Sequence, residues 1–182
     1  MVAVGLLASS FVIWQSSNAA FTATTTNGSN TFGTGSVIIS SAPGTALFTV
    51  TGMKPGSTGS ACLTVTYSGT LAAAVKLYGV SASATNSLDT YLTMQIDETT
   101  GTGGTVTGPS CAGLGAVTNL FNSTLSSFSS TKTSYATGVS SWAPSGAATK
   151  DYKFTYTLSA GAPNSVMSST AAITFTWEAD NT

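Results

Sequence analysis

Few side chains in this 182-residue chain could do chemistry: it has two cysteines, six acidic residues, five lysines and no histidine. Histidine is the commonest general base and the commonest metal ligand, so its absence argues against most hydrolases and metalloenzymes. The acidic residues lack the spacing of a metal site; they are Asp89, Asp97, Glu98, Asp151, Glu178 and Asp180. We expect no enzymatic activity, no cofactor and no metal. Asp97 and Glu98 could touch a calcium ion, but they are better interpreted as solvated acids at a strand end.

The two cysteines are better explained by a structural role than by a reactive one. Cys62 begins a strand-like segment, and Cys111 lies in a glycine-rich stretch. A disulfide between them would close a loop of about 50 residues and contribute roughly 4 kcal/mol in the chain-entropy model. The alternative is a reactive thiol, which needs a nearby cation such as His or Arg to lower its pKa. The chain has neither residue, so we expect a Cys62–Cys111 disulfide.

The composition indicates a β protein that works outside the cell. The chain contains 28 serines and 33 threonines, while only 6% of its residues are charged and the net charge is −1. Threonine favours strands and serine favours turns, and an apolar content of 42% is enough for a core. So few basic residues cannot neutralise a phosphate backbone, which argues against nucleic-acid binding. A surface rich in hydroxyls and poor in charge suits the cell exterior.

The N-terminus has the character of a secretion signal. Residues 1–14 form an uncharged apolar run, which is shorter than the roughly 20 residues of a transmembrane helix. Small residues follow, so we expect residues 1–20 to be a leader that is cleaved at Ala19, Ala20 or Phe21. No positive charge precedes the run, and the alternative is a retained anchor or a buried first element of a cytosolic domain. With cleavage, the mature protein is secreted and has no membrane segment.

Residues 35–182 are predicted to form one antiparallel β-sandwich domain of jelly-roll type. Alternation of apolar and polar residues, or β-rich composition, predicts strands over 35–40, 45–52, 61–68, 72–82, 91–97, 151–159 and 171–179. Pro55-Gly56 predicts a type II turn. Apolar residues at helical spacing predict one short helix over 117–128. Residues 101–115 and 129–150 are expected to be long Ser/Thr/Gly-rich loops.

The order of several short motifs resembles the TasA/camelysin family of secreted bacterial proteins. In order along the chain, the motifs are Ala19-Ala20-Phe21, Asn30-Thr31-Phe32-Gly33-Thr34-Gly35, Met53-Lys54-Pro55-Gly56-Ser57, Tyr67-Ser68-Gly69-Thr70-Leu71 and the ITFTWEADN sequence near the C-terminus. Met53 and Ser57 replace the Leu and Asp of the family pattern, and Tyr67-Ser68 replaces its Asn pair. The resemblance covers about residues 15–80 and 171–181, and the middle of the chain is unmatched.

The resemblance implies a subunit of extracellular biofilm-matrix fibres that polymerises by donor-strand exchange. The N-terminal segment 21–34 would then complete the sheet of the next subunit, with Phe21, Thr22, Thr24, Thr26 and Phe32 as its contact residues. The expected partners are further copies of the chain, and other matrix proteins are additional candidates. Some family members are classed as metallopeptidases, but a chain without histidine does not support that activity.

The main alternative is a secreted β-sandwich adhesin or carbohydrate-binding module. Trp142 lies in a predicted loop of the mature chain, and an exposed indole there could stack on a sugar. The competing interpretation of Trp142 is a plug that covers the core from a loop, which is the more common role of such a residue.

Overall fold

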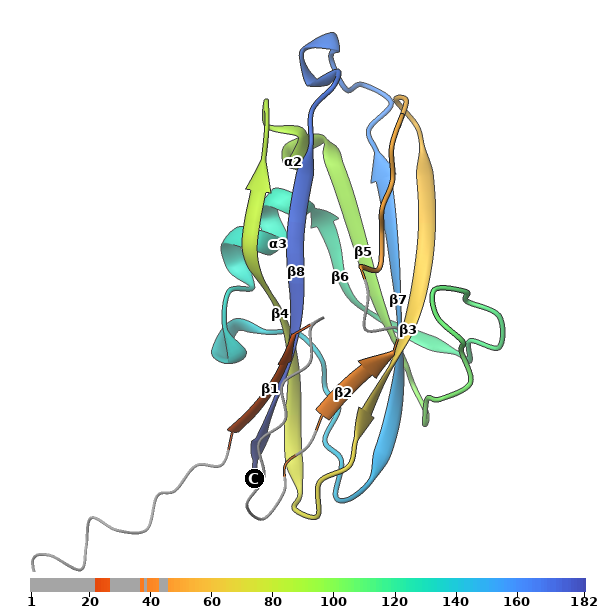
Figure 1. Cartoon of the computed structure of the whole chain (residues 1–182), viewed down its shortest axis with the longest axis vertical. Helices are drawn as coiled ribbons and strands as arrows, with labels where there is room; N and C mark the ends of the chain where they lie inside the picture. The colour runs from red at the N-terminus through yellow and green to blue at the C-terminus, as the bar shows by residue number, and fades with distance from the viewer. Residues whose placement is uncertain (1–21, 27–36, 38, 43–45) are drawn as a thin grey trace, which may run out of the picture.

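The computed structural model describes residues 22–26, 37, 39–42 and 46–182, which form two antiparallel β-sheets packed face to face (Figure 1). One sheet has the order β1-β8-β4, and the other has the order β2-β3-β7-β5-β6. The strands are β1 (Thr22–Thr26), β2 (Ile39–Ala42), β3 (Thr58–Tyr67), β4 (Ala73–Ala84), β5 (Leu92–Thr99), β6 (Val117–Thr124), β7 (Ala148–Leu158) and β8 (Ala171–Asn181). The helical elements are α2 (Leu88–Tyr91), α3 (Leu125–Thr131), and the 3-10 turns η2 (Tyr135–Thr137) and η3 (Asn164–Val166). The predicted antiparallel β-sandwich is confirmed, and its jelly-roll subtype stays a prediction.

Aromatic residues of the two C-terminal strands hold the sheets together. Phe154 on β7 lies with its ring centroid 4.6 Å from Phe175 and 6.0 Å from Trp177, both on β8. Tyr152 contacts the same indole at 5.4 Å. Because β7 and β8 belong to different sheets, these contacts cross the sandwich. Edge-to-face packing adds to the free energy gained by burying the rings.

The alternation of apolar and polar residues correctly predicted which side chains of β3 face the core. On β3, Leu63, Val65 and Tyr67 are buried against the second sheet, while Thr64 and Thr66 are half-buried on the other face. The Pro55-Gly56 turn is also confirmed: Gly56 has φ +85°, and the Ser57 amide donates to the Lys54 carbonyl at 2.8 Å. This positive φ explains why glycine follows proline at the turn.

The predicted helix over 117–128 is wrong for its first eight residues, which form strand β6. β6 pairs with β5, and a β-bulge lies between Ile96 and Asp97. The bulge leaves one β6 residue without an opposite partner, so the neighbours Leu120 and Phe121 both pack against the core. Two adjacent apolar residues that both face the core interrupt the alternation expected of a strand, and their spacing resembles that of a helix. The helix, α3, begins only at Leu125, where Thr124 Oγ1 accepts a hydrogen bond from the Ser127 amide at 3.1 Å.

Two of the predicted N-terminal strands are also corrected. Residues 46–52, the described part of the predicted strand 45–52, are not a strand. Their apolar side chains Leu47 and Phe48 pack against the core between the sheets instead of pairing with a strand. The predicted strand 35–40 is displaced, because β2 covers Ile39–Ala42; residues 35, 36 and 38 lie outside the described residues.

The two long connections differ. Residues 101–115 contain no helix or strand, as predicted. The predicted loop 129–150 contains the end of α3, the turn η2 and the first residues of β7. No helix within the described ranges is long and apolar enough to span a membrane.

Candidate assembly site

Strand β1 lies at the edge of the three-stranded sheet, paired antiparallel with one end of β8. Its five residues oppose Thr176–Asp180, with Thr22 opposite Asp180 and Thr26 opposite Thr176. Thr22, Thr24 and Thr26, the described residues of the predicted polymerisation segment, occupy alternate positions in this strand. Phe21 and Phe32, like the predicted cleavage residues Ala19 and Ala20, lie outside the described residues.

The other half of the β8 edge has no strand on it in the described part of the chain. β8 pairs with β4 along nearly its whole length, from Ala171 to Asn181. On the opposite side, β1 pairs only with Thr176–Asp180, and no other described residue pairs with Ala171–Phe175. An uncovered strand edge presents main-chain groups that can accept another strand.

Residues 132–144 cover part of the opposite edge of the same sheet, from Ala73 to Gly79 of β4. The amides of Ala73, Val75, Leu77 and Gly79 on β4 donate in turn to the carbonyls of Pro144, Trp142, Val139 and Lys132, at 2.7–2.9 Å. The Val139 amide donates back to the Leu77 carbonyl at 2.8 Å, and the Tyr135 hydroxyl donates to the Ala74 carbonyl at 3.1 Å. These bonds occupy the Ala73–Gly79 part of the β4 edge and disfavour strand addition there.

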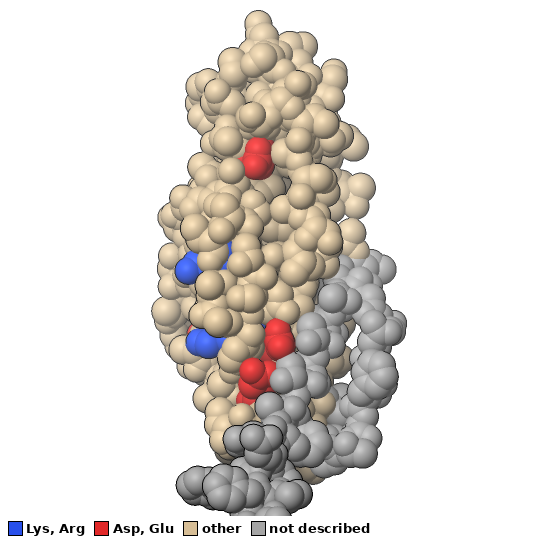
Figure 2. All heavy atoms as spheres, turned by 90° about the vertical axis from the view of Figure 1, so that its left-hand side faces the viewer, with Lys and Arg blue, Asp and Glu red and all other residues tan. Residues whose placement is uncertain are grey.

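Trp142 belongs to this cover and not to a sugar-binding surface. Its side chain is 8% exposed and is part of the hydrophobic core. The interpretation of Trp142 as a loop residue that plugs the core is therefore confirmed, and its proposed stacking on a sugar is wrong. The face of the molecule in Figure 2 carries few charged side chains.

An apolar cavity of about 440 Å³ opens beside the uncovered half of β8. Ala171, Ile173 and Phe175 line it from β8, and Leu47, Phe48 and Met53 line it from the segment 46–53. The walls are almost entirely aliphatic and aromatic side chains, so the cavity suits an apolar group.

Within the described residues, the segment 46–53 contacts the sandwich through its side chains. Phe48 packs edge-to-face on Tyr156, with ring centroids 5.3 Å apart. Its residues form no hydrogen bond with any other described residue, and Val50 is 41% exposed.

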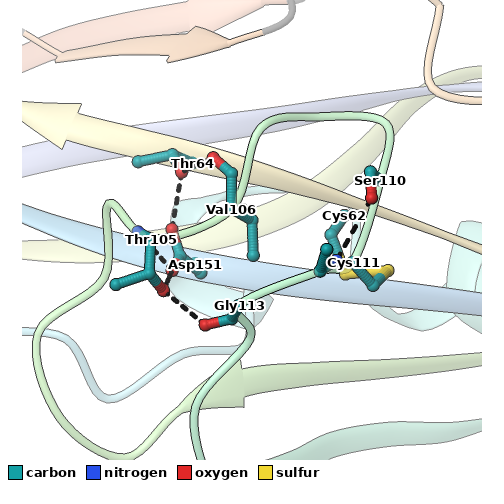
Figure 3. The surroundings of a disulfide bond; sticks show 9 residues. Cys62, Thr64, Thr105, Val106, Ser110, Cys111, Gly113 and Asp151 are labelled. Atoms are coloured by element: carbon teal, nitrogen blue, oxygen red, sulfur yellow. Dashed lines mark hydrogen bonds between the residues drawn. A yellow bond between two sulfur atoms is a disulfide. The ribbon is translucent and has the colours of Figure 1, made fainter.

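The Cys62–Cys111 disulfide fastens a strap, residues 100–116, across the outer side of the five-stranded sheet (Figure 3). The strap leaves the end of β5 and reaches β3, which lies on the far side of β7. The amide of Cys62 donates to the Pro109 carbonyl at 3.0 Å. The predicted disulfide is confirmed, and the alternative of a reactive thiol is excluded in this oxidised state.

Asp151 is the second attachment of the strap. Its carboxylate is fully buried and accepts hydrogen bonds from Thr64 Oγ1 at 2.6 Å, the Gly104 amide at 2.7 Å, and the Thr105 amide and hydroxyl at 3.2 and 3.0 Å (Figure 3). Burial acts to raise the pKa of Asp151, but the bonds from Thr64, Gly104 and Thr105 outweigh it, so the pKa is lowered. The carboxylate is therefore a charged clasp between β3, β7 and the strap.

Asp97 and Glu98 are not solvated, contrary to the sequence-based expectation, since each is only 3% exposed. Asp97 accepts from the side-chain amides of Asn119 at 2.7 Å and Gln95 at 2.9 Å. Glu98 accepts from the hydroxyls of Ser140 at 2.6 Å and Ser141 at 2.8 Å. These partners satisfy the buried carboxylates and make both acids structural. Among the described residues, no group of three or more His, Cys, Asp or Glu is placed to hold a metal.

Sequence reasoning missed three parts of this region. The sequence of residues 132–144 shows no strand pattern. These residues cover β4 with single carbonyl groups and do not pair with it as a regular strand. Asp151 stands on the polar side of an alternating strand, so the pattern gave no sign that a loop would bury it. The uncovered half of β8 depends on the length of β1, which composition does not set.

Comparison with known proteins gives no assignment: neither a scan against protein-family models nor a search of curated proteins finds a match.

Proposed function

We propose that this protein is a structural subunit that self-assembles into an extracellular fibre of a bacterial surface or biofilm matrix. Polymerisation occurs by donor-strand exchange: the N-terminal segment 21–34 of one subunit leaves its own sandwich and pairs with β8 of the next. The observation that carries the proposal is the position of β1, a short edge strand that pairs with the exposed side of β8.

The exchange is favourable on simple energetic grounds. A strand that pairs in trans forms the same kind of main-chain hydrogen bonds as it formed in cis, so the net cost is small. β1 has only five residues, with the sequence TATTT, so a short ladder of main-chain pairs with β8 must separate before it leaves. The cover over Ala73–Gly79 of β4 disfavours strand addition on that side of the sheet, which favours linear polymers over branched aggregates.

Other properties support a location outside the cell. A disulfide persists in oxidising compartments and is rare in the cytosol. The low charge fraction of 6% and the motifs that resemble the TasA/camelysin family point the same way. In this proposal residues 1–20 are removed on export, and the mature chain polymerises with itself, with other matrix proteins as additional candidate partners.

The test is a deletion of residues 21–30 from the mature protein. We expect the deletion variant to keep its β-sheet circular dichroism and elute as a monomer, and to form no filaments under the electron microscope. Met167→Ala, at a side chain that is 68% exposed and far along the chain from β1, is the control that should polymerise like the wild type. Filaments that persist after the deletion would disprove strand exchange. A wild-type protein that stays monomeric and binds a glycan array would favour the alternative adhesin function.

A further inference from the structure

We propose that Glu178 and Asp180, on the outer face of β8, bind a calcium ion with the hydroxyl of Thr176 beside it. These three side chains alternate along β8 with residues that are buried in the core. Successive side chains of a strand point to opposite faces, so the three share the face that points away from the core. The inference does not depend on the proposed function, because ion binding is measurable whether or not the chain polymerises.

The carboxylate of Asp180 is incompletely satisfied. Its Oδ1 atom is buried and has no hydrogen-bond partner. By contrast, the buried carboxylates of Asp97, Glu98 and Asp151 each accept more than one hydrogen bond. A carboxylate oxygen that is buried without a donor is costly, and a cation beside it would offset that cost.

Thr176 gives a second, independent indication of a ligand on this face. Its side chain is 1% exposed, yet its Oγ1 atom has no hydrogen-bond partner. Tyr78 lies directly opposite Thr176 on β4 and donates its hydroxyl to Glu178 Oε2 at 2.7 Å. The unpartnered hydroxyl of Thr176 and the carboxylate of Glu178 therefore adjoin the same tyrosine.

Within the described residues, no lysine forms an ion pair with either acid. Lys76 lies opposite Glu178 on β4, but its ammonium group donates to a main-chain carbonyl at 2.7 Å. Burial raises the pKa of Tyr78, and so do its hydrogen bond to Glu178 and the charges of Glu178 and Asp180. Burial and the same two charges raise the pKa of Tyr135. Two carboxylates therefore act on one small region without a positive partner.

The donor set fits calcium better than zinc. Zinc prefers histidine and cysteine ligands, but the chain has no histidine and both cysteines form the disulfide. Calcium takes carboxylate, hydroxyl and water oxygens in flexible geometry. Residues two positions apart on a strand lie about 7 Å apart, so the carboxylates of Glu178 and Asp180 can bend toward one ion. A water on that ion can reach Thr176 Oγ1. With two carboxylates, we expect a dissociation constant of ~10⁻⁴–10⁻³ M, as in extracellular calcium modules.

The proposed site borders the ladder between β1 and β8. Glu178 pairs with Thr24 of β1, and Asp180 pairs with Thr22. An ion bound to the two acids neutralises charge next to this ladder, and a ligand that binds only the folded chain stabilises it. The site departs from the sequence-based expectation of no metal, because the orphaned oxygens are visible only in the folded chain.

Terbium luminescence with calcium competition tests the site on the mature chain. Terbium replaces calcium at oxygen sites, and a nearby tyrosine such as Tyr78 excites its emission. We expect saturable emission that calcium displaces. Glu178→Gln and Asp180→Asn should each weaken calcium binding at least about 10-fold, since both remove a charged ligand. Thr176→Val keeps the shape of the side chain and should weaken binding several-fold. Asp89→Asn, at an acid of α2, is the matched control and should bind like the wild type.

Thermal unfolding separates a lost site from a damaged fold. In a chelator, Asp180→Asn should melt no lower than the wild type, because it removes a carboxylate that lacks a partner for a buried oxygen. In millimolar calcium, the melting temperature should rise for the wild type and for Asp89→Asn, but not for Asp180→Asn.

Three results would overturn the proposal: terbium emission that does not saturate, calcium that fails to displace terbium, or equal calcium affinity in the wild type and Asp180→Asn. Unchanged binding by Thr176→Val would exclude its hydroxyl from the site. None of these results bears on the fibre proposal, which the deletion of residues 21–30 tests separately.

Discussion

The carboxylate of Asp151 on β7 accepts a 2.6 Å hydrogen bond from the hydroxyl of Thr64, its directly opposite neighbour on β3. The same carboxylate binds two residues of the strap, so one buried charge joins two strands and a loop. A buried charge is stable only when such donors surround it.

Replacement of this carboxylate is expected to destabilise the protein. Asp151→Asn keeps the size of the side chain but replaces an acceptor oxygen with an NH₂ group that faces the donors of Gly104 or Thr105. We expect a loss of about 2–3 kcal/mol, the usual cost of breaking hydrogen bonds to a buried charged group. Urea unfolding at pH 7 measures it. The control is Asp89→Asn, because Asp89 is only half-buried and lies in the first turn of α2. This change should alter the free energy of unfolding by less than about 0.5 kcal/mol.

The Asp151 carboxylate also makes the free energy of unfolding depend on pH. Because the folded-state pKa of Asp151 is lowered from its ordinary value of 3.8, the unfolded chain binds the proton first as the pH falls. The stabilisation is therefore complete above the ordinary pKa and disappears as the pH drops through the lowered folded-state pKa. Urea midpoints measured from pH 7 down to pH 2 should fall less steeply for Asp151→Asn than for the wild type. Parallel curves would contradict this assignment.

Removal of the disulfide should weaken the fold without abolishing it. The double variant Cys62→Ser and Cys111→Ser loses roughly 2–4 kcal/mol, which corresponds to a lower melting temperature by about 5–15 °C for a domain of this size. Asp151 still holds the strap, so the far-ultraviolet circular dichroism at 25 °C should be unchanged. An unfolded double variant would show that the clasp is not sufficient.

The cover of the β4 edge should protect the protein from side-on aggregation. Trp142→Ala removes a buried indole, with an expected cost of about 3–5 kcal/mol, and loosens the residues whose carbonyls occupy the edge. We expect Trp142→Ala to form irregular aggregates on mild heating, and light scattering measures their amount. Trp142→Phe, which keeps an aromatic plug, should aggregate much less. Equal aggregation by the two variants would mean that the indole does not anchor the cover.

A pair of proline variants tests how β1 is used in assembly. Successive main-chain amides of an edge strand point alternately toward the sheet and away from it. Proline removes one amide, so of Thr24→Pro and Thr25→Pro one should lose a bond to β8 and the other should not. We expect filament formation to fall at least 10-fold in one variant and much less in the other. Equal effects would argue against strand pairing as the assembly contact.

The sequence was sufficient where local pattern and burial agree, and insufficient where contacts are distant in the chain. The alternation of Tyr152 and Phe154 and of Phe175 and Trp177 predicted two core-facing strands, and both are present. The adjacent core contacts of Leu120 and Phe121 have the spacing of a helix, yet a bulge produces them in a strand. Asp97 and Glu98 were expected to be solvated because their partners, Asn119 and Ser140, come from segments more than 20 residues away.

The candidate assembly site was predicted only in part. Threonine-rich residues 22–26 were expected to be extended, and they form β1. Its pairing partner, and the shortness of β1 relative to β8, depend on how two ends of the chain meet in one sheet. Such a contact joins residues about 150 positions apart, which no local pattern encodes.

The covalent link between Cys62 and Cys111 has a mechanical consequence for a fibre of the proposed kind. Tension would enter each subunit through its N-terminal segment and leave through β8, so the load must pass along the backbone between these points. The link closes a span of 49 residues inside that route, which would otherwise lengthen by roughly 160 Å if drawn out fully. The oxidised link would therefore shorten the maximum extension of each subunit in a strained filament by that length.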